Sequence, residues 1–359
     1  MKVVTVLGAR PQFIKAATVS RAFKEVNVNE VIIHTGQHFD RNMSEVFFTE
    51  MDIPQPDYNL GISGLGHGTM TGRMLEQIET VIVKEKPDCV LVYGDTNSTL
   101  AGALAASKLH VPIAHVEAGL RSFEMKMPEE VNRILTDRIS NFLFCPTSTA
   151  VENLKREGFE HFNCEIIQCG DVMYDAVLYY TKMADQKSSL IESLGLNDTP
   201  FVLATIHRAE NTDHLQRLSS ICMALNQINK EARVILPLHP RTRGLLTQHK
   251  IELEFEPIDP VGYFDMLALL EKCQLVLTDS GGLQKEGYFF GKYCITMRDQ
   301  TEWVELVSAG ANALVGASYQ NIVDQSQKNM GKSVITNTAL YGDGSASKKI
   351  AKKLANFSI

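Results

Sequence analysis

The sequence is short of the features that place a chain in a membrane or outside the cell. No apolar run approaches the length of about 18 residues that a membrane-spanning helix needs. The first apolar run, at residues 3–7, is too short for the core of a signal peptide and is typical of a first β-strand. We therefore expect no membrane partner and no export signal.

A surplus of positive charge is also missing. The 42 acidic side chains outnumber the 35 lysines and arginines, and the formal net charge is −7. A nucleic-acid-binding protein normally presents a broad basic surface. The charge balance argues against that class, so we expect no nucleic-acid partner. Any phosphate group must be held by a few well-placed side chains.

Cysteine pairs at metal-binding or redox spacing are absent as well. The seven cysteines form an odd set without a C-x-x-C motif, and several lie inside apolar runs. Such thiols behave as small reduced hydrophobes, which is typical of a cytoplasmic protein. The histidines lack the Cys/His spacing of a zinc site, so we expect no metal.

The sequence does contain a repeated alternation of short β-branched runs with longer amphipathic stretches. This rhythm predicts βαβ units whose strands are apolar on both faces, the pattern of a parallel sheet covered by helices. The predicted strands of the first half are residues 2–7, 30–35, 89–93, 113–116 and 142–145. After polar stretches at 185–189 and 197–200, the predicted strands are residues 201–205, 234–237, 275–278 and 294–297.

The fold class that follows is α/β, with two doubly wound Rossmann-like domains. We assign residues 1–170 to the first domain, residues 171–342 to the second, and residues 345–356 to a closing amphipathic helix. Ligands of open α/β sheets bind beyond the carboxyl ends of the strands. We therefore expect the loops of the two domains to face a central cleft and to carry the functional residues.

One such loop combines small residues with the start of a helix. The run that ends at Thr278 is followed by Asp279-Ser280-Gly281-Gly282, after which a helix begins. Backbone N–H groups beside the glycines can approach phosphate oxygens, and the helix directs its positive end to the same place. A diphosphate is the natural ligand for such a loop. The alternative is a strand-to-helix turn in which Ser280 caps the helix, and these residues alone leave both interpretations open.

The loop after the first strand carries cations. It lacks the G-x-G-x-x-G spacing of a dinucleotide site, which argues against NAD, but it places Arg10 and Lys15 beside a helix start. The alternative is a tight turn in which Pro11 begins the helix and Arg10 is solvated.

A further arginine follows a strand of the second domain. Arg298 comes directly after the apolar run 294–297, with Asp299 and Glu302 close behind. Its guanidinium either pairs with one of these acids or reaches a ligand phosphate through a bidentate contact.

Titratable groups follow three other predicted strands, at Asp95, Glu117 and His207. Taken singly, they are explained as a helix cap, a solvated loop carboxylate and a structural histidine. Glu129 lies in a predicted first helical turn, where the helix dipole favours carboxylates for structural reasons. Asp95, Glu117 and His207 share a position just after a predicted strand, and this shared position indicates a functional site.

Taken in order, these motifs resemble the non-hydrolysing UDP-N-acetylglucosamine 2-epimerase family over essentially the whole chain. The segments that carry the resemblance are Gly8–Pro11, Gly94–Thr96, His115–Arg121, Pro128–Arg133, His207–Asn211, Asp279–Glu286 and Tyr341–Gly344. The resemblance implies a two-domain fold of the GT-B type and a homodimer. It also implies that the C-terminal helix, residues 343–359, packs back on the first domain.

The resemblance further implies roles for individual residues. Residues expected to bind the UDP-sugar are Arg10, Lys15, His239, Ser280, Gly281, Gly282, Glu286 and Arg298. Acid–base roles would fall to Asp95, Glu117, Glu129 and His207. The family's second, regulatory UDP-N-acetylglucosamine site aligns with Gln37, Arg73 and His239.

The implied reaction accounts for this set of groups. The C2 proton of a 2-acetamido sugar lies beside no carbonyl of the ring, so direct deprotonation is unfavourable. Loss of UDP from C1 makes that proton removable and gives a 2-acetamidoglucal-type alkene, to which an acid returns a proton on the opposite face as UDP re-adds. Two faces need two proton carriers, which we draw from Asp95, Glu117 and Glu129. His207 and Arg10 would steady the diphosphate, and no metal or redox cofactor is required.

Details of the motifs are more similar to one branch of the family. This branch acts on UDP-2,3-diacetamido-2,3-dideoxyglucuronate and gives the manno isomer for surface polysaccharide. Where the family often has Thr-Glu-Arg-Pro-Glu, this chain has Trp303 and Val304 at the third and fourth positions. The alternatives are an epimerase that converts UDP-N-acetylglucosamine to UDP-N-acetylmannosamine, a glycosyltransferase with the same architecture, and a non-catalytic UDP-sugar sensor.

Overall fold

The computed structural model describes residues 1–37, 48–49 and 51–357 and divides the chain into two compact units. The N-terminal unit comprises Met1–Leu178 and Thr338–Ile359, and the C-terminal unit comprises Tyr179–Asn337. The predicted boundaries, 170/171 and 342/343, lie near these but do not coincide with them. The first differs because helix α7 (Val172–Lys187) runs from one unit into the next.

The sheet of the N-terminal unit has seven parallel strands in the order β3-β2-β1-β4-β5-β6-β7. The strands are β1 (Lys2–Leu7), β2 (Asn29–His34), β3 (Tyr58–Asn59), β4 (Cys89–Tyr93), β5 (Ile113–Val116), β6 (Phe142–Cys145) and β7 (Glu165–Gln168). The chain moves outward from β1 in both directions. The switch point of the sheet, where such folds bind ligands, therefore lies between β1 and β4.

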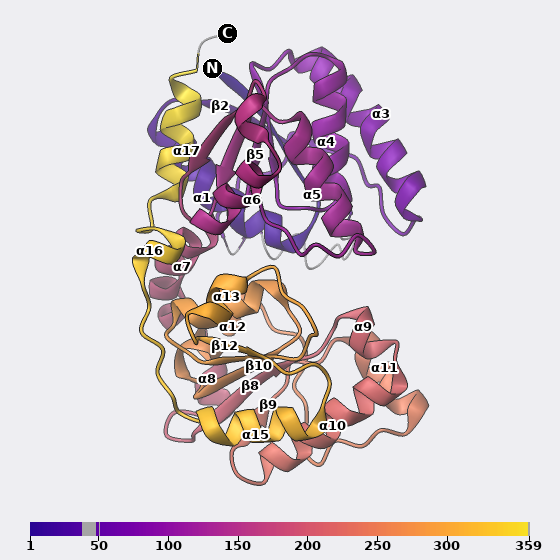
Figure 1. Ribbon diagram of the computed structural model, residues 1–359, viewed down its shortest axis with the longest axis vertical. Coiled ribbons are helices and arrows are strands. Elements are labelled where there is room, and N and C mark those ends of the chain that lie inside the picture. Colours follow the sequence, from indigo (N-terminus) through magenta and orange to yellow (C-terminus); the bar gives the residue numbers. More distant parts are fainter. Residues whose placement is uncertain (38–47, 50, 358–359) are drawn as a thin grey trace. The chain divides into compact units, whose positions relative to one another are not determined.

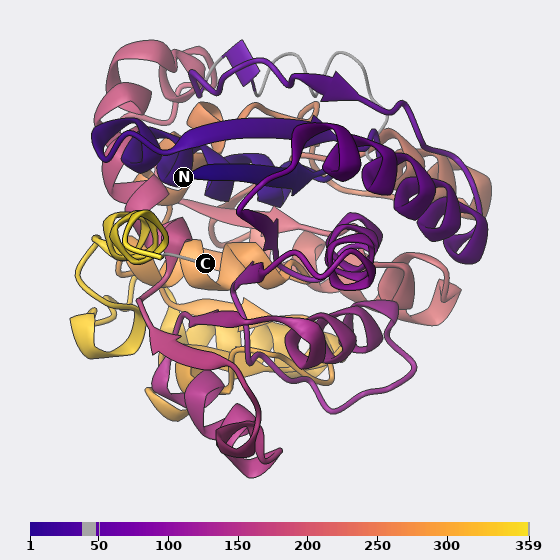
Figure 2. The same cartoon turned by 90° about the horizontal axis from the view of Figure 1, so that it is seen from above.

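Helices cover both faces of this sheet. On one side α1 (Arg10–Glu25) packs against α17 (Ala346–Ala355), and both views show the two helices together (Figures 1 and 2). On the other side lie α3 (His67–Glu85), α4 (Asn97–Lys108) and α5 (Pro128–Ile139) (Figure 1). Valines of β1 and β4 pack on the apolar stripe of α3, which buries the centre of the sheet. The remaining elements are α6 (Ser148–Arg156), a 3-10 turn (Phe159–His161) and α16 (Thr338–Tyr341).

The C-terminal unit has a second parallel sheet, with five strands in the order β12-β11-β10-β8-β9. The strands are β8 (Phe201–Thr205), β9 (Arg233–Ile235), β10 (Leu275–Thr278), β11 (Cys294–Thr296) and β12 (Asn312–Leu314). Its helices are α8 (Leu190–Ser193), α9 (Ala209–Thr212), α10 (Leu215–Asn229), α11 (Pro240–His249), α12 (Tyr263–Lys272), α13 (Gly281–Phe289), α14 (Val304–Ser308) and α15 (Tyr319–Asn329). The switch point of this sheet lies between β8 and β10.

Every strand predicted from the sequence is present, with ends shifted by no more than two residues. The three strands that the sequence did not predict, β3, β7 and β12, all lie at sheet edges. An edge strand is covered less completely than a central one, so it does not need a continuous apolar run. The predicted closing helix is α17. Within the described ranges, none of the helices combines the length and the apolar character that a membrane crossing requires.

Candidate functional site

The switch point of the N-terminal sheet brings together the loops after β1 and β4. Gln12, in the first turn of α1, accepts hydrogen bonds from the backbone N–H groups of Gly8 and Ala9 at 2.8 and 3.0 Å. Its amide nitrogen donates to the carbonyl of Tyr93 at 2.8 Å and to the hydroxyl of Thr96 at 2.9 Å. One buried side chain thus ties the two loops together and fixes their relative position.

Lys15 and Glu117 form a buried ion pair at this edge of the sheet, with side chains only 8% and 9% exposed. Glu117 directly follows β5 and has a φ of +75°, which is uncommon outside glycine. Gly94 follows β4, and a Cβ added there would lie 3.3 Å from the Glu117 carboxylate and 3.4 Å from the Lys15 ammonium. The structure therefore brings these two predicted site residues together, directly over the Gly94 backbone.

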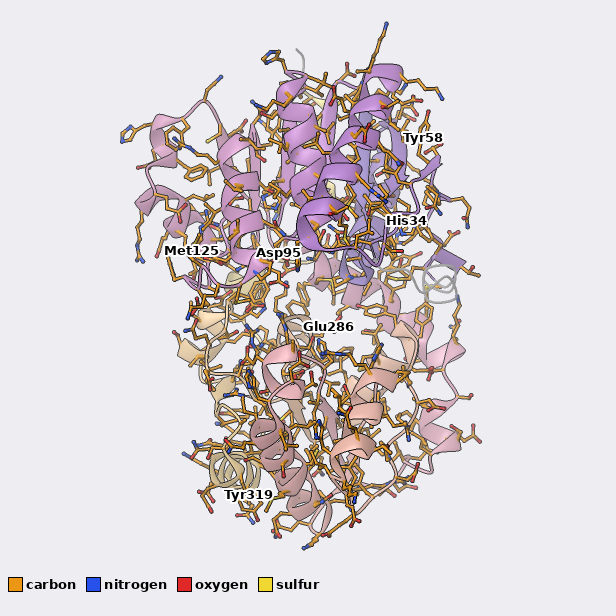
Figure 3. The ribbon with its side chains drawn as sticks, turned by 90° about the vertical axis from the view of Figure 1, so that its right-hand side faces the viewer. His34, Tyr58, Asp95, Met125, Glu286 and Tyr319 are labelled. Atoms are coloured by element: carbon orange, nitrogen blue, oxygen red, sulfur yellow. The ribbon has the colours of Figure 1, made fainter. Side chains whose placement is uncertain are left out.

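Asp95, labelled in Figure 3, is held by a second cation. Its carboxylate forms an ion pair with Arg133 of α5, and Arg133 also contacts Glu130 at 2.6 Å. The buried Glu130 accepts hydrogen bonds from the N–H groups of Ser122 and Phe123 at 2.9 Å. The Asp95 side chain is 29% exposed, whereas that of Arg133 is 4% exposed. The carboxylate is therefore accessible, while its counter-ion is anchored in the protein.

The structure gives fewer contacts for the two other predicted site residues of this unit, Glu129 and Arg10. Glu129 lies half-buried in the first turn of α5 and takes part in no ion pair with the residues that the structure describes. Arg10 begins α1, but its side chain lies outside the described part of the structure. The roles of both residues stay predictions.

A buried network of charged groups lies behind these loops. His115 in β5 and Asp137 in α5 are fully buried and are joined at 2.7 Å. Asp137 also accepts hydrogen bonds from Arg121 at 2.7 Å and from the N–H of Gly119 at 3.1 Å. Burial raises the pKa of Asp137, but the hydrogen bonds and charges of His115 and Arg121 outweigh it and hold that pKa below its usual range. Asp137 is therefore an ionised carboxylate in the interior.

Asp279 joins the two loops at the switch point of the C-terminal sheet. Its fully buried carboxylate accepts hydrogen bonds from the backbone N–H groups of His207 and Arg208 at 3.0 Å, and Nδ1 of His207 lies 3.1 Å away. Burial raises the pKa of Asp279, but the contacts with His207 outweigh it and lower that pKa. The His207 side chain is 49% exposed, so its ring is oriented by Asp279 and still accessible to a ligand.

The small-residue loop of this unit lies at the start of α13. Ser280 caps the helix by accepting a hydrogen bond from the N–H of Leu283 at 3.5 Å, so the cap that the turn interpretation predicted is present. This cap uses the third N–H group of the helix. The first two, of Gly281 and Gly282, have no acceptor within the helix. Capping by Ser280 is therefore compatible with an anion-binding loop.

Charged groups gather at the same helix start. Arg298 pairs with Glu302 at 3.0 Å, and these side chains are only 2% and 9% exposed. A Cβ added to Gly281 would lie 2.2 Å from the Glu302 carboxylate and 3.7 Å from Arg208. Of the two possibilities left open by the sequence, the structure shows the pairing of Arg298 with an acid.

Gly281→Ala is expected to destabilise the C-terminal unit, whereas Gly282→Ala is not. The methyl group at position 281 displaces Glu302 from Arg298, and loss of a hydrogen bond between charged groups costs about 1.5–3 kcal/mol. At position 282 the methyl group meets nothing within 4 Å, and alanine is favoured over glycine in a helix by about 0.5–1 kcal/mol. Urea unfolding followed by the fluorescence of Trp303, the only tryptophan in the sequence, measures both changes. Equal stability of the two variants would contradict the close approach of Glu302.

The other predicted residues of this unit differ in their surroundings. Glu286 lies in α13 with its side chain buried. His239 is exposed and caps α11, where its Nδ1 accepts a hydrogen bond from the N–H of Arg241 at 3.2 Å. Contact of either residue with a substrate stays a prediction. In the ranges that the structure covers, His, Cys, Asp and Glu side chains form no group of three or more suited to a metal ion.

Three residues of the site, Gln12, Arg133 and Asp137, had no role predicted from the sequence. The sequence carried a weak signal for the last two, because their spacing of four residues puts them on one face of a helix, and the structure shows that both are buried. Charged side chains are rarely buried without partners, so the network can be recognised once the burial of this face is known. Gln12 gave a weaker signal, as a glutamine at the third position of a helix that can bond back to the preceding loop.

Comparison with known proteins places both units in one family of sequences. A protein-family model described as UDP-N-acetylglucosamine 2-epimerase matches residues 21–355. The chain is 59% identical over 357 residues to the UDP-2,3-diacetamido-2,3-dideoxy-D-glucuronate 2-epimerase of Pseudomonas aeruginosa, with 99% of each chain covered. It is 35% identical over 382 residues to the UDP-N-acetylglucosamine 2-epimerase of Escherichia coli O157:H7, again with 99% of each covered.

Solved structures agree with the sequence matches. The UDP-GlcNAc 2-epimerase of Methanocaldococcus jannaschii, in complex with UDP-GlcNAc and UDP, is similar with a TM-score of 0.91 and 41% identity, covering 99% of this chain and 100% of that one. The enzyme of Neisseria meningitidis bound to UDP-GlcNAc gives a TM-score of 0.89 and 31% identity at the same coverage. The predicted fold class, α/β with two doubly wound domains of the GT-B type, is confirmed.

Proposed function

Because the chain belongs to the UDP-N-acetylglucosamine 2-epimerase family, we propose that it inverts C2 of UDP-2,3-diacetamido-2,3-dideoxy-D-glucuronate and gives the manno isomer for surface polysaccharide synthesis. The observation that carries the proposal is the arrangement in the N-terminal unit. Two carboxylates, Asp95 and Glu117, follow neighbouring parallel strands, and each is paired with a cation anchored in the protein. Such a pair supplies the two proton carriers that inversion at one carbon needs.

The reaction proceeds by elimination and re-addition of UDP. One carboxylate takes the C2 proton as the C1–O bond breaks, and the electrons of the C–H bond form the C1–C2 double bond while UDP leaves with the electrons of the C–O bond. A second group then gives a proton to the opposite face of C2, and UDP re-forms its bond to C1. Asp95, Glu117 and Glu129 are the proposed carriers. No net oxidation or reduction occurs.

The leaving diphosphate needs groups that stabilise developing negative charge. We assign this to Ser280, Gly281 and Gly282 at the start of α13, because the free N–H groups and the dipole of that helix favour an anion. The buried Arg298 and the half-exposed His207 supply further donors in the same unit. These interactions strengthen as the C1–O bond breaks, so they lower the barrier instead of only tightening substrate binding.

Further ligand contacts complete the proposal. Glu286 and His239 of the C-terminal unit, with Arg10 and Lys15 of the N-terminal unit, are assigned to the UDP-sugar. Lys15 is supported by its buried pairing with Glu117, which places an ammonium group beside a proposed proton carrier.

The choice of substrate rests on similarity. A relative whose name specifies UDP-2,3-diacetamido-2,3-dideoxy-D-glucuronate is 59% identical over nearly the whole chain, compared with 44% for the UDP-N-acetylglucosamine 2-epimerase of Methanocaldococcus jannaschii. The alternative substrate is UDP-N-acetylglucosamine, because the structure of the Methanocaldococcus jannaschii enzyme with that sugar is so similar to this chain.

A parallel assay of the two UDP-sugars in deuterated water tests the proposal. We expect turnover of the diacetamido-glucuronate without any acceptor, with one deuterium placed at C2 of the product. A kcat/KM that is higher for UDP-N-acetylglucosamine than for the diacetamido-glucuronate would show that UDP-N-acetylglucosamine is the substrate. Turnover only in the presence of an acceptor, with no label at C2, would indicate a glycosyltransferase, and binding without turnover would indicate a sensor.

The proposal includes a reducing, cytoplasmic location. All seven cysteines are unpaired in the structure, and burial raises the pKa of Cys222, Cys273 and Cys294 to about 12. Thiols with such pKa values react slowly with oxidants, which fits cysteines that serve as core residues. A homodimer stays a prediction from the family.

A further inference from the structure

His115 lies fully buried in β5, directly behind the loops that carry the proposed proton carriers. Its Nε2 lies 2.7 Å from the backbone carbonyl oxygen of Gly94, and its Nδ1 lies 2.7 Å from Asp137. A carbonyl can only accept a hydrogen bond. Asp137 is ionised, since it also accepts from Arg121 and from the N–H of Gly119. Both ring nitrogens of His115 therefore face acceptors, and Nε2 donates a hydrogen bond to the Gly94 carbonyl.

The contact with Gly94 controls the orientation of one peptide group. The carbonyl of Gly94 and the N–H of Asp95 belong to the same planar peptide, so a hydrogen bond to this carbonyl fixes the direction from which Asp95 leaves the strand. Gly94 has a φ of +60° and no side chain, so its backbone has more freedom than that of any other residue type. The ion pair of Lys15 and Glu117 lies over the same peptide.

Two residues of α5 hold the backbone carbonyl and the side chain of Asp95. The amide of Asn132 donates to the carbonyl of Asp95 at 2.9 Å, and Arg133 pairs with its carboxylate. Asp137, the second partner of His115, also holds the N–H of Gly119, two residues after Glu117. A single buried pair thus connects the loop of Asp95 with the loop of Glu117.

We propose that His115 is a positioning residue for proton transfer, which holds the Gly94 peptide so that Asp95 and Glu117 keep a fixed geometry at C2. The proposal rests on the proposed epimerase function. His115 itself is buried behind the loops and touches no reacting atom. Its effect should therefore appear in kcat, because a shift of about 1 Å in a catalytic group can cost about 10²-fold in rate.

Two substitutions of the same residue separate positioning from stability. In His115→Gln the amide nitrogen lies near the place of Nε2 and can still donate to Gly94, whereas in His115→Asn it lies near the place of Nδ1 and can only reach Asp137. Both variants replace the ring with a neutral amide that can keep one of its two hydrogen bonds, so both should lose stability to a similar extent. We expect His115→Asn to lose about 10²-fold in kcat and His115→Gln to retain a kcat at least about tenfold higher, with KM values close to that of the wild type.

Equal kcat values for the two variants, or a difference confined to KM, would overturn the proposal. A measurement on the wild-type protein covers the case in which either variant does not fold: ¹⁵N NMR of the His115 ring should show Nε2 protonated and protected from exchange. An unprotonated Nε2 of His115 would overturn the proposal. Absence of turnover by the wild type with either UDP-sugar would instead count against the proposed function, and the NMR result would still decide the geometry.

Discussion

Asp95→Asn is expected to lower kcat for epimerisation by about 10²–10⁴-fold and to leave KM almost unchanged. Asparagine has the shape of aspartate and can still accept a hydrogen bond from Arg133, but it cannot take up the C2 proton. The substitution leaves intact the groups of the C-terminal unit that we assign to the diphosphate, Ser280–Gly282, Arg298 and His207. Steady-state kinetics give both constants, and exchange of the C2 hydrogen with deuterated water tests proton transfer directly.

Asp95 offers a sharper test than Glu117. Glu117 forms a buried pair with Lys15, so its replacement by glutamine would leave a buried ammonium without a counter-ion. Loss of activity in that variant would mix an effect on chemistry with an effect on folding. When Asp95 is replaced, Arg133 keeps its contact with Glu130, and the charge in the interior stays balanced.

Asp88→Asn is a matched control for this experiment. Asp88 directly precedes β4, the strand that Asp95 follows, so it lies at the amino-terminal ends of the strands, away from Asp95. It accepts a hydrogen bond from the N–H of Lys2 at 2.7 Å. The same substitution at this position should leave kcat and KM unchanged. If the Asp95 variant exchanged the C2 hydrogen at the wild-type rate, Asp95 would no longer be a proton carrier, and Glu117 and Glu129 would remain as candidates.

The sheets could be predicted from the sequence because strands that are buried on both faces need continuous apolar runs. β4 and β10 are fully buried, and both are predicted with the bounds that the structure shows. The positions of Asp95 and Ser280 follow from the same reasoning, since parallel strands place their carboxyl ends at one edge. The order of strands and loops along the sequence was therefore enough to predict that Asp95 and Ser280 lie at the ligand-binding ends of their sheets.

The partners of these residues could not be predicted in the same way. Arg133 lies 38 residues from Asp95, and no local feature of either segment fixes their pairing. Arg298 shows a second limit, since its sequence neighbours allowed both an ion pair and a phosphate contact. Only the packing of Glu302 against Gly281 shows that the pair forms beside the proposed diphosphate loop. Contacts that depend on tertiary packing need the structure.

Asp137→Asn is expected to lower the free energy of unfolding of the N-terminal unit by about 3 kcal/mol. Removal of one partner from a buried ion pair costs about 3–5 kcal/mol, because the remaining charge stays buried. The lower end applies here, since Arg121 keeps Glu157 at 2.7 and 2.8 Å. Urea unfolding followed by far-UV circular dichroism measures the change. The fluorescence of Trp303 reports the C-terminal unit.

Glu157→Gln is the control for burial. Glu157 contacts the same arginine as Asp137, but its side chain is 34% exposed. Because the Glu157 carboxylate reaches solvent and the buried Arg121 keeps Asp137 as a partner, this variant should lose much less stability than the Asp137 variant. Equal losses in the Asp137 and Glu157 variants would show that burial does not set the cost at Asp137.

The effect of Asp137→Asn should also depend on pH in one direction. The pKa of Asp137 in the folded protein lies below its value of about 3.9 in an unfolded chain. The contribution of the carboxylate is therefore complete above the unfolded value and is lost as the pH falls through the folded value. The unfolding free energies of wild type and variant should be well separated between about pH 5 and 8 and should converge in acid. A separation that persisted into strong acid would mean that Asp137 acts through packing and not through its charge.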